Sequence, residues 1–321
     1  MYVLELGGQD DEFAAFEAES AASDVTVVAP GLATARGITD RIDHLAYTQA
    51  ASELLGRCDP DVASARTLLE ATTVQRTGSV AVRAEDVRGR TGVDTQRTER
   101  ELGQELVDRG FAVDLDDPDH ELRVLFAEGT CAVGWLVAES VRDYGERKPT
   151  DRPFFQPGSM DPLLARALVN MAGARPGATV LDPMCGTGGI LLEAALVGAR
   201  VLGLDAQEKM VRGTHRNLSA ELDGDWGVVR GDARSLPVAD DAIDAVVFDA
   251  PYGRQSKIEG DLHSLILDAL EEARRVAPRC VMVGDRPWAQ PAHEAGWTTE
   301  AAFDRHVHRS LTRYVLVLRR S

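Results

Sequence analysis

The sequence of 321 residues predicts an α/β fold in which a parallel, doubly wound sheet occupies the C-terminal half. Three observations predict it. Strand and helix patterns alternate from about residue 158 onward. A glycine-rich turn, 182–189, follows the first of these strands, and a later apolar strand ends in Asp249-Ala250-Pro251-Tyr252. Both segments come at the carboxyl ends of strands, where doubly wound sheets bind their ligands.

Two smaller α+β units, 1–55 and 56–147, are expected ahead of that sheet. Their predicted elements are a strand at 2–6, a helix at 12–20, strands at 25–29 and 79–83, a helix that begins at Thr95 or Thr98 and stops at Gly110, and a hairpin of strands 122–128 and 131–137. Thr98 and Glu101 have the spacing of a capping box at the start of the second helix.

A proline-rich and charged stretch then predicts an interdomain linker, placed at 148–157. It is followed by the doubly wound unit, 158–321. The expected strands are 179–182, 200–205, 227–230, 243–249 and 279–284, and the expected helices are 190–197, 209–222 and 262–276. A last strand, 311–318, is expected to join the sheet as an antiparallel edge.

The charge composition is strongly acidic and poor in lysine. The net charge is -17, and only three of the 35 basic residues are lysine. A halophile's cytosol favours such a surface, because carboxylates hold water in concentrated salt, although a GC-rich genome also produces arginine bias. In about 1 M salt the Debye length falls to about 3 Å, so the acidity does not exclude RNA as a partner.

The sequence favours a reducing, cytoplasmic location. No apolar run approaches the roughly 18 residues that span a bilayer, and no secretion signal is evident at the N-terminus. The four cysteines are scattered without a CxxC pair, which argues against a disulfide framework or a zinc site. His306 and His308 could form half of a metal site, but a structural or RNA-facing role is favoured, and no metal or membrane partner is expected.

Acidic residues after three successive strands indicate the kind of cofactor. Asp182 precedes the glycine turn, where it would repel a pyrophosphate but could receive the ammonium group of S-adenosylmethionine. Asp205, 19 residues after Gly186, is placed to hold ribose hydroxyls, although by itself it could be a helix N-cap. Asp232 is placed to accept from an adenine amine. The predicted cofactor-binding residues are Asp182, Gly186, Gly188, Asp205, Asp232 and Ala233.

The segment 249–252 predicts methylation of an amine on a flat ring. The Asp249 carboxylate and a backbone carbonyl could each accept one amine hydrogen, which would point the nitrogen lone pair at the methyl group. Tyr252 would stack on the base, a contact worth about 1–3 kcal/mol. Pro251 holds the residue before it extended. The competing interpretation is an ordinary Asp-Pro turn at a strand end.

Three segments carry a family resemblance. DPMCGTGGILLEAALVGARVLGLDA (182–206), RKPTDRPFFQPGSMDPLLARALVNMA (147–172) and HRSLTR (308–313) resemble the archaeal tRNA guanine-N2 methyltransferases that modify position 10. The resemblance implies a ferredoxin-like piece, a THUMP domain and a Rossmann-like class I methyltransferase domain. It further implies S-adenosylmethionine as cofactor, tRNA as partner, and dimethylation of guanine N2, with the base unstacked into the pocket.

The resemblance also raises two questions about individual residues. The family motif usually reads Asp-Pro-Pro-Tyr; Ala250 here keeps the carbonyl but loses one fixed φ angle, which puts the rigidity of the pocket in doubt. The THUMP likeness makes four arginines candidates for gripping the tRNA 3′ end: Arg83, Arg88, Arg90 and Arg97. The alternative is a solvated arginine face paired with Glu85, Asp86 and Asp94.

Several functions stay open on the sequence alone. The same motif methylates adenine N6 or a protein glutamine, and related guanine-N2 enzymes act at other tRNA positions or on ribosomal RNA. A non-catalytic RNA-binding protein is the alternative outside enzymes. Neither the number of methyl groups transferred nor the oligomeric state is determined, and a monomer is compatible with the sequence.

Overall fold

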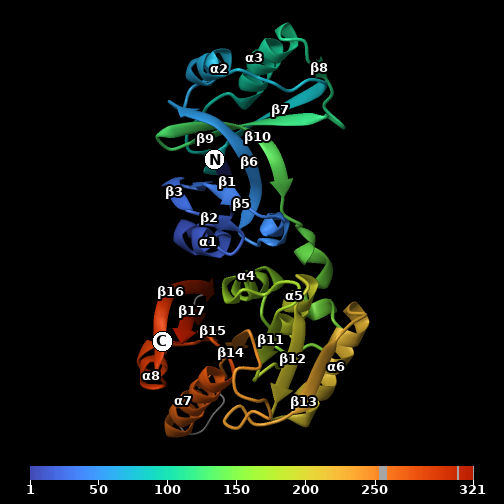
Figure 1. Cartoon of the computed structure of the whole chain (residues 1–321), viewed down its shortest axis with the longest axis vertical. Helices are drawn as coiled ribbons and strands as arrows, with labels where there is room; N and C mark the ends of the chain where they lie inside the picture. Colours follow the sequence, from blue (N-terminus) through green and yellow to red (C-terminus); the bar gives the residue numbers. More distant parts are fainter. Residues whose placement is uncertain (253–258, 309–310, 321) are drawn as a thin grey trace. The chain divides into compact units, whose positions relative to one another are not determined.

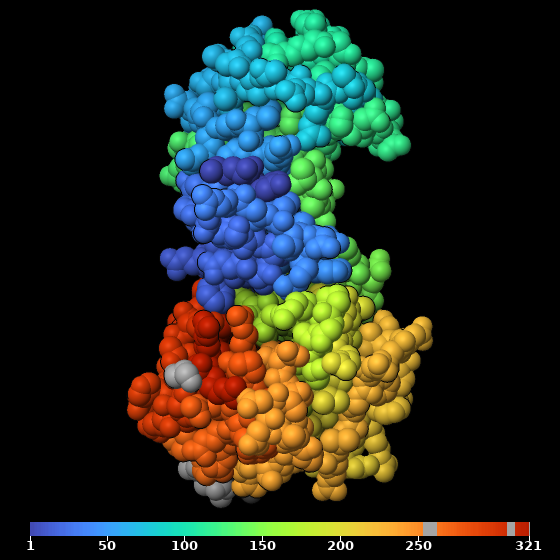
Figure 2. All heavy atoms as spheres, viewed as in Figure 1, coloured from blue at the N-terminus to red at the C-terminus, as the bar shows by residue number. Residues whose placement is uncertain are grey.

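The computed structural model describes residues 1–252, 259–308 and 311–320. The chain divides into two compact units, Met1–Val141 and Arg142–Ser321, which we call the first and second unit (Figure 1). Figure 2 shows the same chain with all its atoms, coloured from blue at the N-terminus to red at the C-terminus. Among the described residues, no helix is both long enough and apolar enough to cross a membrane.

The first unit is built on a mixed sheet of eight strands, in the order β3-β4-β1-β6-β10-β9-β7-β8, beside a small two-stranded sheet of β2 and β5. Its elements are β1 (Tyr2–Leu6), α1 (Asp11–Ala18), β2 (Ala22–Ser23), β3 (Thr26–Ala29), β4 (Leu32–Ala35), β5 (Gly37–Ile38), β6 (Thr48–Cys58), α2 (Val62–Ala71), β7 (Ser79–Asp86), α3 (Thr95–Asp108), β8 (Ala112–Val113), β9 (His120–Ala127) and β10 (Thr130–Glu139). The expected boundary at residue 55 lies inside β6. This strand pairs with β1 on one side and with β10 on the other, so one sheet runs through both expected pieces.

The third α-helix of this unit, α3, shows where a local prediction fails. Asp94 is its N-cap, and the Asp94 side chain accepts from the Arg97 amide at 2.9 Å. Thr98 lies inside the helix, where its hydroxyl donates to the Asp94 carbonyl, so the capping-box prediction is wrong. The Asp94 carboxylate already accepts from the Arg97 amide, which has no partner within the helix. The predicted stop at Gly110 is confirmed by its φ of 96°.

The second unit contains a seven-stranded sheet in the order β13-β12-β11-β14-β15-β17-β16. Its elements are α4 (Pro162–Ala172), β11 (Thr179–Asp182), α5 (Gly189–Leu196), β12 (Arg200–Asp205), α6 (Glu208–Glu221), β13 (Trp226–Arg230), β14 (Ala245–Asp249), α7 (Glu259–Val276), β15 (Arg279–Gly284), α8 (Ala289–Glu294), β16 (Trp297–His308) and β17 (Leu311–Arg320). Strands β11 to β15 run parallel, and the chain order reverses between β11 and β14. The doubly wound prediction is therefore confirmed, with α6 packed on β12 and β13 and α7 on β15 (Figure 1).

The C-terminal strand is not the edge that the sequence suggests. β17 is antiparallel as predicted, but it lies between β15 and β16, and β16 is the edge strand. The sequence of β16, WTTEAAFDRHVH, is rich in polar side chains, so it has no clear apolar alternation. An edge strand tolerates such side chains because one of its sides is open to solvent.

The segment expected as a linker, 148–157, is instead packed against the second unit. Arg147, just before it, is buried and pairs with Glu193 of α5 at 2.8 Å. The Phe154 amide donates to the Asn217 side chain, which in turn donates to the Phe154 carbonyl, both at 2.8 Å. The Phe154 ring lies so close to Gly213 of α6 that a β-carbon there would collide with it. Proline and charge therefore mark a segment that is docked on the rest of the second unit and includes a short 3-10 helix, 149–151.

Candidate active site

A cavity of about 190 Å³ lies at the carboxyl ends of β11 and β14. Three segments form its walls: 156–160, the turn after β11 from Asp182 to Ile190, and Asp249 at the end of β14. The structure thus brings together the glycine turn and the substrate motif that the sequence singled out. The third wall, 156–160, belongs partly to the segment expected as a linker.

The glycine turn has the backbone conformation that its residues predict. Gly186 and Gly188 have φ angles of 53° and 79°, which side chains rarely adopt. A β-carbon on Gly188 would lie 2.6 Å from Cγ2 of Thr214, so the turn also needs the missing side chain. The Gly186 amide donates to Asp205 at 3.1 Å, and its carbonyl accepts from the Thr214 hydroxyl at 2.7 Å. These bonds hold the turn open toward the cavity.

Asp182 is a carboxylate enclosed at the base of this turn. It is only 2% exposed and accepts from the Met184 amide at 3.0 Å. Burial raises its pKa well above the ordinary range, and the negative charges of Asp205 and Asp249 raise it further. No cation pairs with it in the part of the chain that the structure describes. A positive group, such as the ammonium of S-adenosylmethionine, would offset the cost of this buried charge. The buried carboxylate of Asp182 therefore fits that cofactor.

The other expected cofactor residues lie outside the lining of this cavity. Asp205 accepts from the amides of Gly186 and Gln207, at 3.1 and 2.8 Å, and burial raises its pKa. Asp232 follows β13 and holds Arg234 in a two-pronged ion pair, with bonds of 2.7 and 3.0 Å that lower the Asp232 pKa. Ala233 is buried beside it. Asp205 and Asp232 therefore lie off the ends of neighbouring strands, where a longer ligand could reach them from the cavity.

Asp249 lines the cavity and forms a hydrogen-bonded pair with Tyr252. The Tyr252 hydroxyl lies 3.0 and 3.2 Å from the two Asp249 carboxylate oxygens. Burial raises the pKa of Asp249 to about 6, even though the Arg313 charge and the Tyr252 bond act in the opposite direction. Burial and the Asp249 charge also raise the pKa of Tyr252. Pro251 is exposed. The hydroxyl of Tyr252 thus serves as a hydrogen-bond partner of Asp249, in addition to any role of the ring.

Arg313 is the residue of this site that sequence reasoning missed. Its Nε donates to the Tyr252 hydroxyl at 2.9 Å, and its Nη2 lies 3.8 Å from Asp249. It falls inside the HRSLTR segment, but nothing in its spacing connects a C-terminal strand with the end of β14. Residues 309–310 of that segment, and the side chain of His308, lie outside the described residues.

Ala250 is held by the sheet itself. Its amide donates to the Val283 carbonyl of β15 at 2.8 Å, a bond that proline could not make. Compared with proline, alanine at this position lacks a fixed φ angle but adds one backbone hydrogen bond to the sheet. This bond supplies a restraint on the motif that the sequence alone did not reveal.

The four candidate RNA-binding arginines are each paired with an acid, but not with the expected partners. Arg83 lies 3.8 Å from Glu121, Arg88 pairs with Asp11 of α1, Arg90 lies 3.3 Å from Glu128, and Arg97 lies 2.6 Å from Glu101. Asp86 and Asp94 bind backbone amides instead. Arg88 has the most enclosed side chain of the four, 20% exposed, whereas those of Arg90 and Arg97 are more than half exposed.

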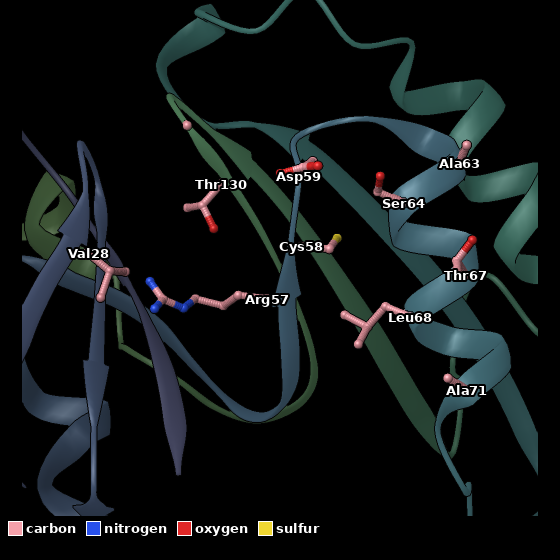
Figure 3. A pocket seen from close by; sticks show the side chains of 11 residues that line it. Val28, Arg57, Cys58, Asp59, Ala63, Ser64, Thr67, Leu68, Ala71 and Thr130 are labelled. Carbon is pink, nitrogen blue, oxygen red and sulfur yellow. The ribbon is translucent and has the colours of Figure 1, made fainter.

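A larger hollow in the first unit, of about 830 Å³, was not expected from the sequence. It lies between α2, the end of β6 and the β9–β10 turn, and Arg57, Ser64, Thr67 and Thr130 are among its lining residues. Figure 3 shows the Arg57 side chain extending from β6 toward Val28. No ion pair holds Arg57 within the described part of the chain. Cys58, also in the lining, faces Cys131 across the β6–β10 pair, and both thiols are free.

Comparisons with known proteins agree with this site. Residues 149–314 match the RMKL-like methyltransferase domain family. The chain is 35% identical over 288 residues to a tRNA (guanine(10)-N2)-dimethyltransferase of Methanothermobacter thermautotrophicus, which covers 86% of this chain and 84% of that protein. It is 32% identical to a tRNA (guanine(6)-N2)-methyltransferase of Thermus thermophilus, covering 74% and 71%.

Solved structures show the same fold. TrmN from Thermus thermophilus superimposes with a TM-score of 0.52 at 22% identity, covering 100% of this chain and 99% of that one. SMU.472, solved in complex with SAH, gives a TM-score of 0.52 at 11% identity, covering 100% and 98%. The second unit is thus a Rossmann-like class I methyltransferase domain. The chain belongs to the RMKL-like methyltransferase family and, within it, to the archaeal tRNA guanine-N2 methyltransferases.

Proposed function

We propose that this protein transfers methyl groups from S-adenosylmethionine to the exocyclic N2 of a guanine in tRNA, and that it dimethylates position 10. The observation that carries the proposal is the single cavity walled by Asp182, the glycine turn and Asp249. Asp182 suits the charged end of the cofactor, and Asp249 suits an amine. The names of the relatives support guanine N2 as the acceptor and tRNA as the substrate.

The Asp249 carboxylate prepares the amine for transfer in this proposal. Its pKa of about 6 leaves it mostly ionised at neutral pH, so it can accept one amine hydrogen while a backbone carbonyl of the motif accepts the other. When bound, the cofactor supplies an electrophilic methyl group. The proton lost from the guanine nitrogen on methylation would pass to Asp249 or to water.

The remaining residues would position the two ligands. Asp182 would receive the cofactor ammonium, Asp205 the ribose hydroxyls and Asp232 the adenine amine, for which Asp232 must share its oxygens with Arg234. The ring of Tyr252 would pack against the guanine. Pro251 would keep the peptide before it extended, with its carbonyl available to the amine.

Substitution of Asp249 tests the catalytic assignment. We expect Asp249→Ala to abolish methyl transfer while cofactor affinity, measured by calorimetry, stays within about threefold, because the cofactor is held mainly by the other wall. Asp223→Ala is the matched control, since Asp223 is exposed and absent from the cavity lining. Full methyl transfer by the Asp249 variant would contradict the catalytic role of Asp249.

Nucleoside analysis tests the position and the number of methyl groups. Reaction with unmodified tRNA, followed by nuclease digestion and mass spectrometry, should give N2,N2-dimethylguanosine in the fragment that contains position 10. The relative that acts on guanine 6 makes the fragment containing position 6 the necessary comparison. N6-methyladenosine as the sole product would replace the proposal with adenine methylation.

We infer that the first unit contains the ferredoxin-like and THUMP pieces and binds the tRNA. Arg90 and Arg97, whose ion pairs are exposed, can exchange a carboxylate for a phosphate at little cost. Arg88, enclosed with Asp11, is expected to stabilise the unit. At working salt, the double substitution Arg90→Ala and Arg97→Ala should lower tRNA affinity several-fold without lowering the melting temperature, whereas Arg88→Ala should mainly lower the melting temperature. Unchanged tRNA affinity in the double variant would support the alternative that these arginines form a solvated face.

We further propose that the protein works in the cytoplasm of a halophilic archaeon, on the basis of its charge of -17 and its three lysines. Thermal unfolding in a series of potassium chloride concentrations tests this. A melting temperature that rises steadily to about 2 M salt supports the proposal, and one that falls contradicts it.

A further inference from the structure

Arg313 is a buried cation whose place in the site follows only from the tertiary fold. It is 4% exposed and projects from β17, which pairs with β15 next to β14. Its guanidinium donates to the Tyr252 hydroxyl at 2.9 Å and to the Gly158 carbonyl at 3.2 Å. It thereby joins the 156–160 segment, which lines the cavity, to Tyr252, the hydrogen-bond partner of the lining residue Asp249.

We propose that Arg313 is a positioning residue: it fixes the Tyr252 hydroxyl, and through that hydroxyl it sets the orientation of the Asp249 carboxylate. The inference rests on the proposed function, because it concerns the same transfer step. Arg313 itself touches neither the base nor the cofactor in this proposal, since its donors are directed at Tyr252, Gly158 and Asp249.

The hydrogen-bond directions support this assignment. The Arg313 Nε–H donates to the Tyr252 oxygen, so the single hydroxyl proton of Tyr252 is free to donate to Asp249. A tyrosine held in this way offers its proton in a fixed direction. A lysine at position 313 would keep the positive charge, but it could not reproduce the planar, two-pointed geometry that contacts Tyr252 and Gly158 together.

The charges around Asp249 make the effect measurable. The groups that face it are Arg313 from β17, Asp285 after β15, Asp182 at the end of β11, and the Tyr252 hydroxyl. Burial and Asp285 raise the Asp249 pKa, while Arg313 and Tyr252 lower it. Removal of the Arg313 charge must therefore raise that pKa further, and the ionised form that accepts the amine hydrogen will be lost at a higher pH.

The test compares Arg313→Met, Arg313→Lys and Tyr252→Phe in the full-length protein, with Arg319→Met as the matched control. Arg319 lies on the same strand with a side chain 65% exposed, far from the Tyr252 pair. In Arg313→Met we expect the acidic limb of kcat/KM for tRNA to move up by about one pH unit, with kcat at least tenfold lower. Arg313→Lys should keep the limb near its wild-type position but with reduced kcat, and the control should match wild type in both.

A double variant separates positioning from general damage. If Arg313 acts through Tyr252, combining Arg313→Met with Tyr252→Phe should lower kcat no more than the worse single substitution. Affinity for S-adenosylhomocysteine, measured by calorimetry, should stay within threefold in every variant. An unmoved acidic limb in Arg313→Met, or multiplicative losses in the double variant, would overturn the inference. If the wild-type protein methylates no guanine in the same assay, the proposed function fails instead.

Discussion

At the scale of residues, the two walls of the cavity use the same side chain in two different environments. Asp182 is buried and Asp249 is half-buried, with 22% of its side chain exposed, and burial raises the pKa of each. Asp249 differs because Arg313 and Tyr252 partly oppose that rise, which keeps its pKa near 6. Asp182 has only the Met184 amide to oppose it, so it gains most from the arrival of a positive ligand.

The environment of Asp249 predicts how the rate depends on pH. Its folded pKa of about 6 lies above the ordinary value for aspartate, so the active, ionised form is lost as the pH falls through 6. We expect single-turnover methyl transfer to decline about tenfold per pH unit below that point. Cofactor binding must be measured over the same range, so that a loss of binding is not read as a loss of chemistry. A rate that is level between pH 5 and pH 8 would contradict the role of Asp249.

The amide of Ala250 predicts the effect of restoring the family proline. Ala250→Pro removes the hydrogen bond to the buried Val283 carbonyl, so we expect the free energy of unfolding to fall by about 1–3 kcal/mol. Urea unfolding with and without S-adenosylhomocysteine measures this change. A variant as stable as wild type would show that the surrounding strands can shift to satisfy Val283 by other means.

At the scale of elements, the helix that follows the glycine turn is fixed by a buried charge cluster. Glu193 of α5 is fully buried and accepts from Arg147 at 2.8 Å and from Arg166 of α4 at 2.9 Å. The Tyr144 ring lies 5.0 Å from the Arg147 guanidinium. The cluster ties α4, α5 and the segment before 148–157 together, and thereby sets the position of the turn at the start of α5.

Removal of the acid from this cluster should be costly. Glu193→Ala removes the acid between two buried guanidinium groups, although Arg147 keeps its pair with Asp143 at 2.6 Å, so we expect a loss of about 3 kcal/mol in the free energy of unfolding. Glu208→Ala in the next helix is the matched control: its pair with Arg212 is exposed, and such pairs contribute less than about 1 kcal/mol. Denaturant unfolding of the two variants measures both changes. Equal losses would show that the cluster stabilises no more than a surface pair.

At the scale of the whole molecule, the chain divides at Val141 and Arg142, before the stretch that its composition marks as a linker. Residues 142–157 contact the rest of the second unit: Arg147 pairs with Glu193, the Phe154 amide donates to Asn217, and the Arg152 guanidinium lies against Gly189. Two residues of the same stretch, Gln156 and Pro157, line the cavity. The catalytic unit therefore begins near residue 142.

Two fragments test this boundary. We expect fragment 142–321 to fold and bind S-adenosylhomocysteine, and fragment 158–321 to melt about 10 °C lower because it lacks the Arg147–Glu193 pair and the Phe154–Asn217 bonds. Thermal unfolding and calorimetry measure the two properties. Equal melting temperatures of the two fragments would support the interpretation of residues 148–157 as a linker.

The sequence by itself determined the parallel sheet, the glycine turn and the position of Asp249. Each of these depends on local patterns: apolar runs for β11, β12 and β15, glycines where φ is positive, and an acid at a strand end. A local pattern is visible in the chain because the physical cause lies within a few residues of its effect.

Only the tertiary structure decided the partners of these residues. It brought Arg313 to Tyr252, Val283 to the amide of Ala250, and Glu193 to Arg147. It also made β6 a strand shared by both expected N-terminal pieces and placed β16 outside β17. These contacts join segments far apart in the chain, and their energies depend on burial and direction, which spacing in a sequence does not contain.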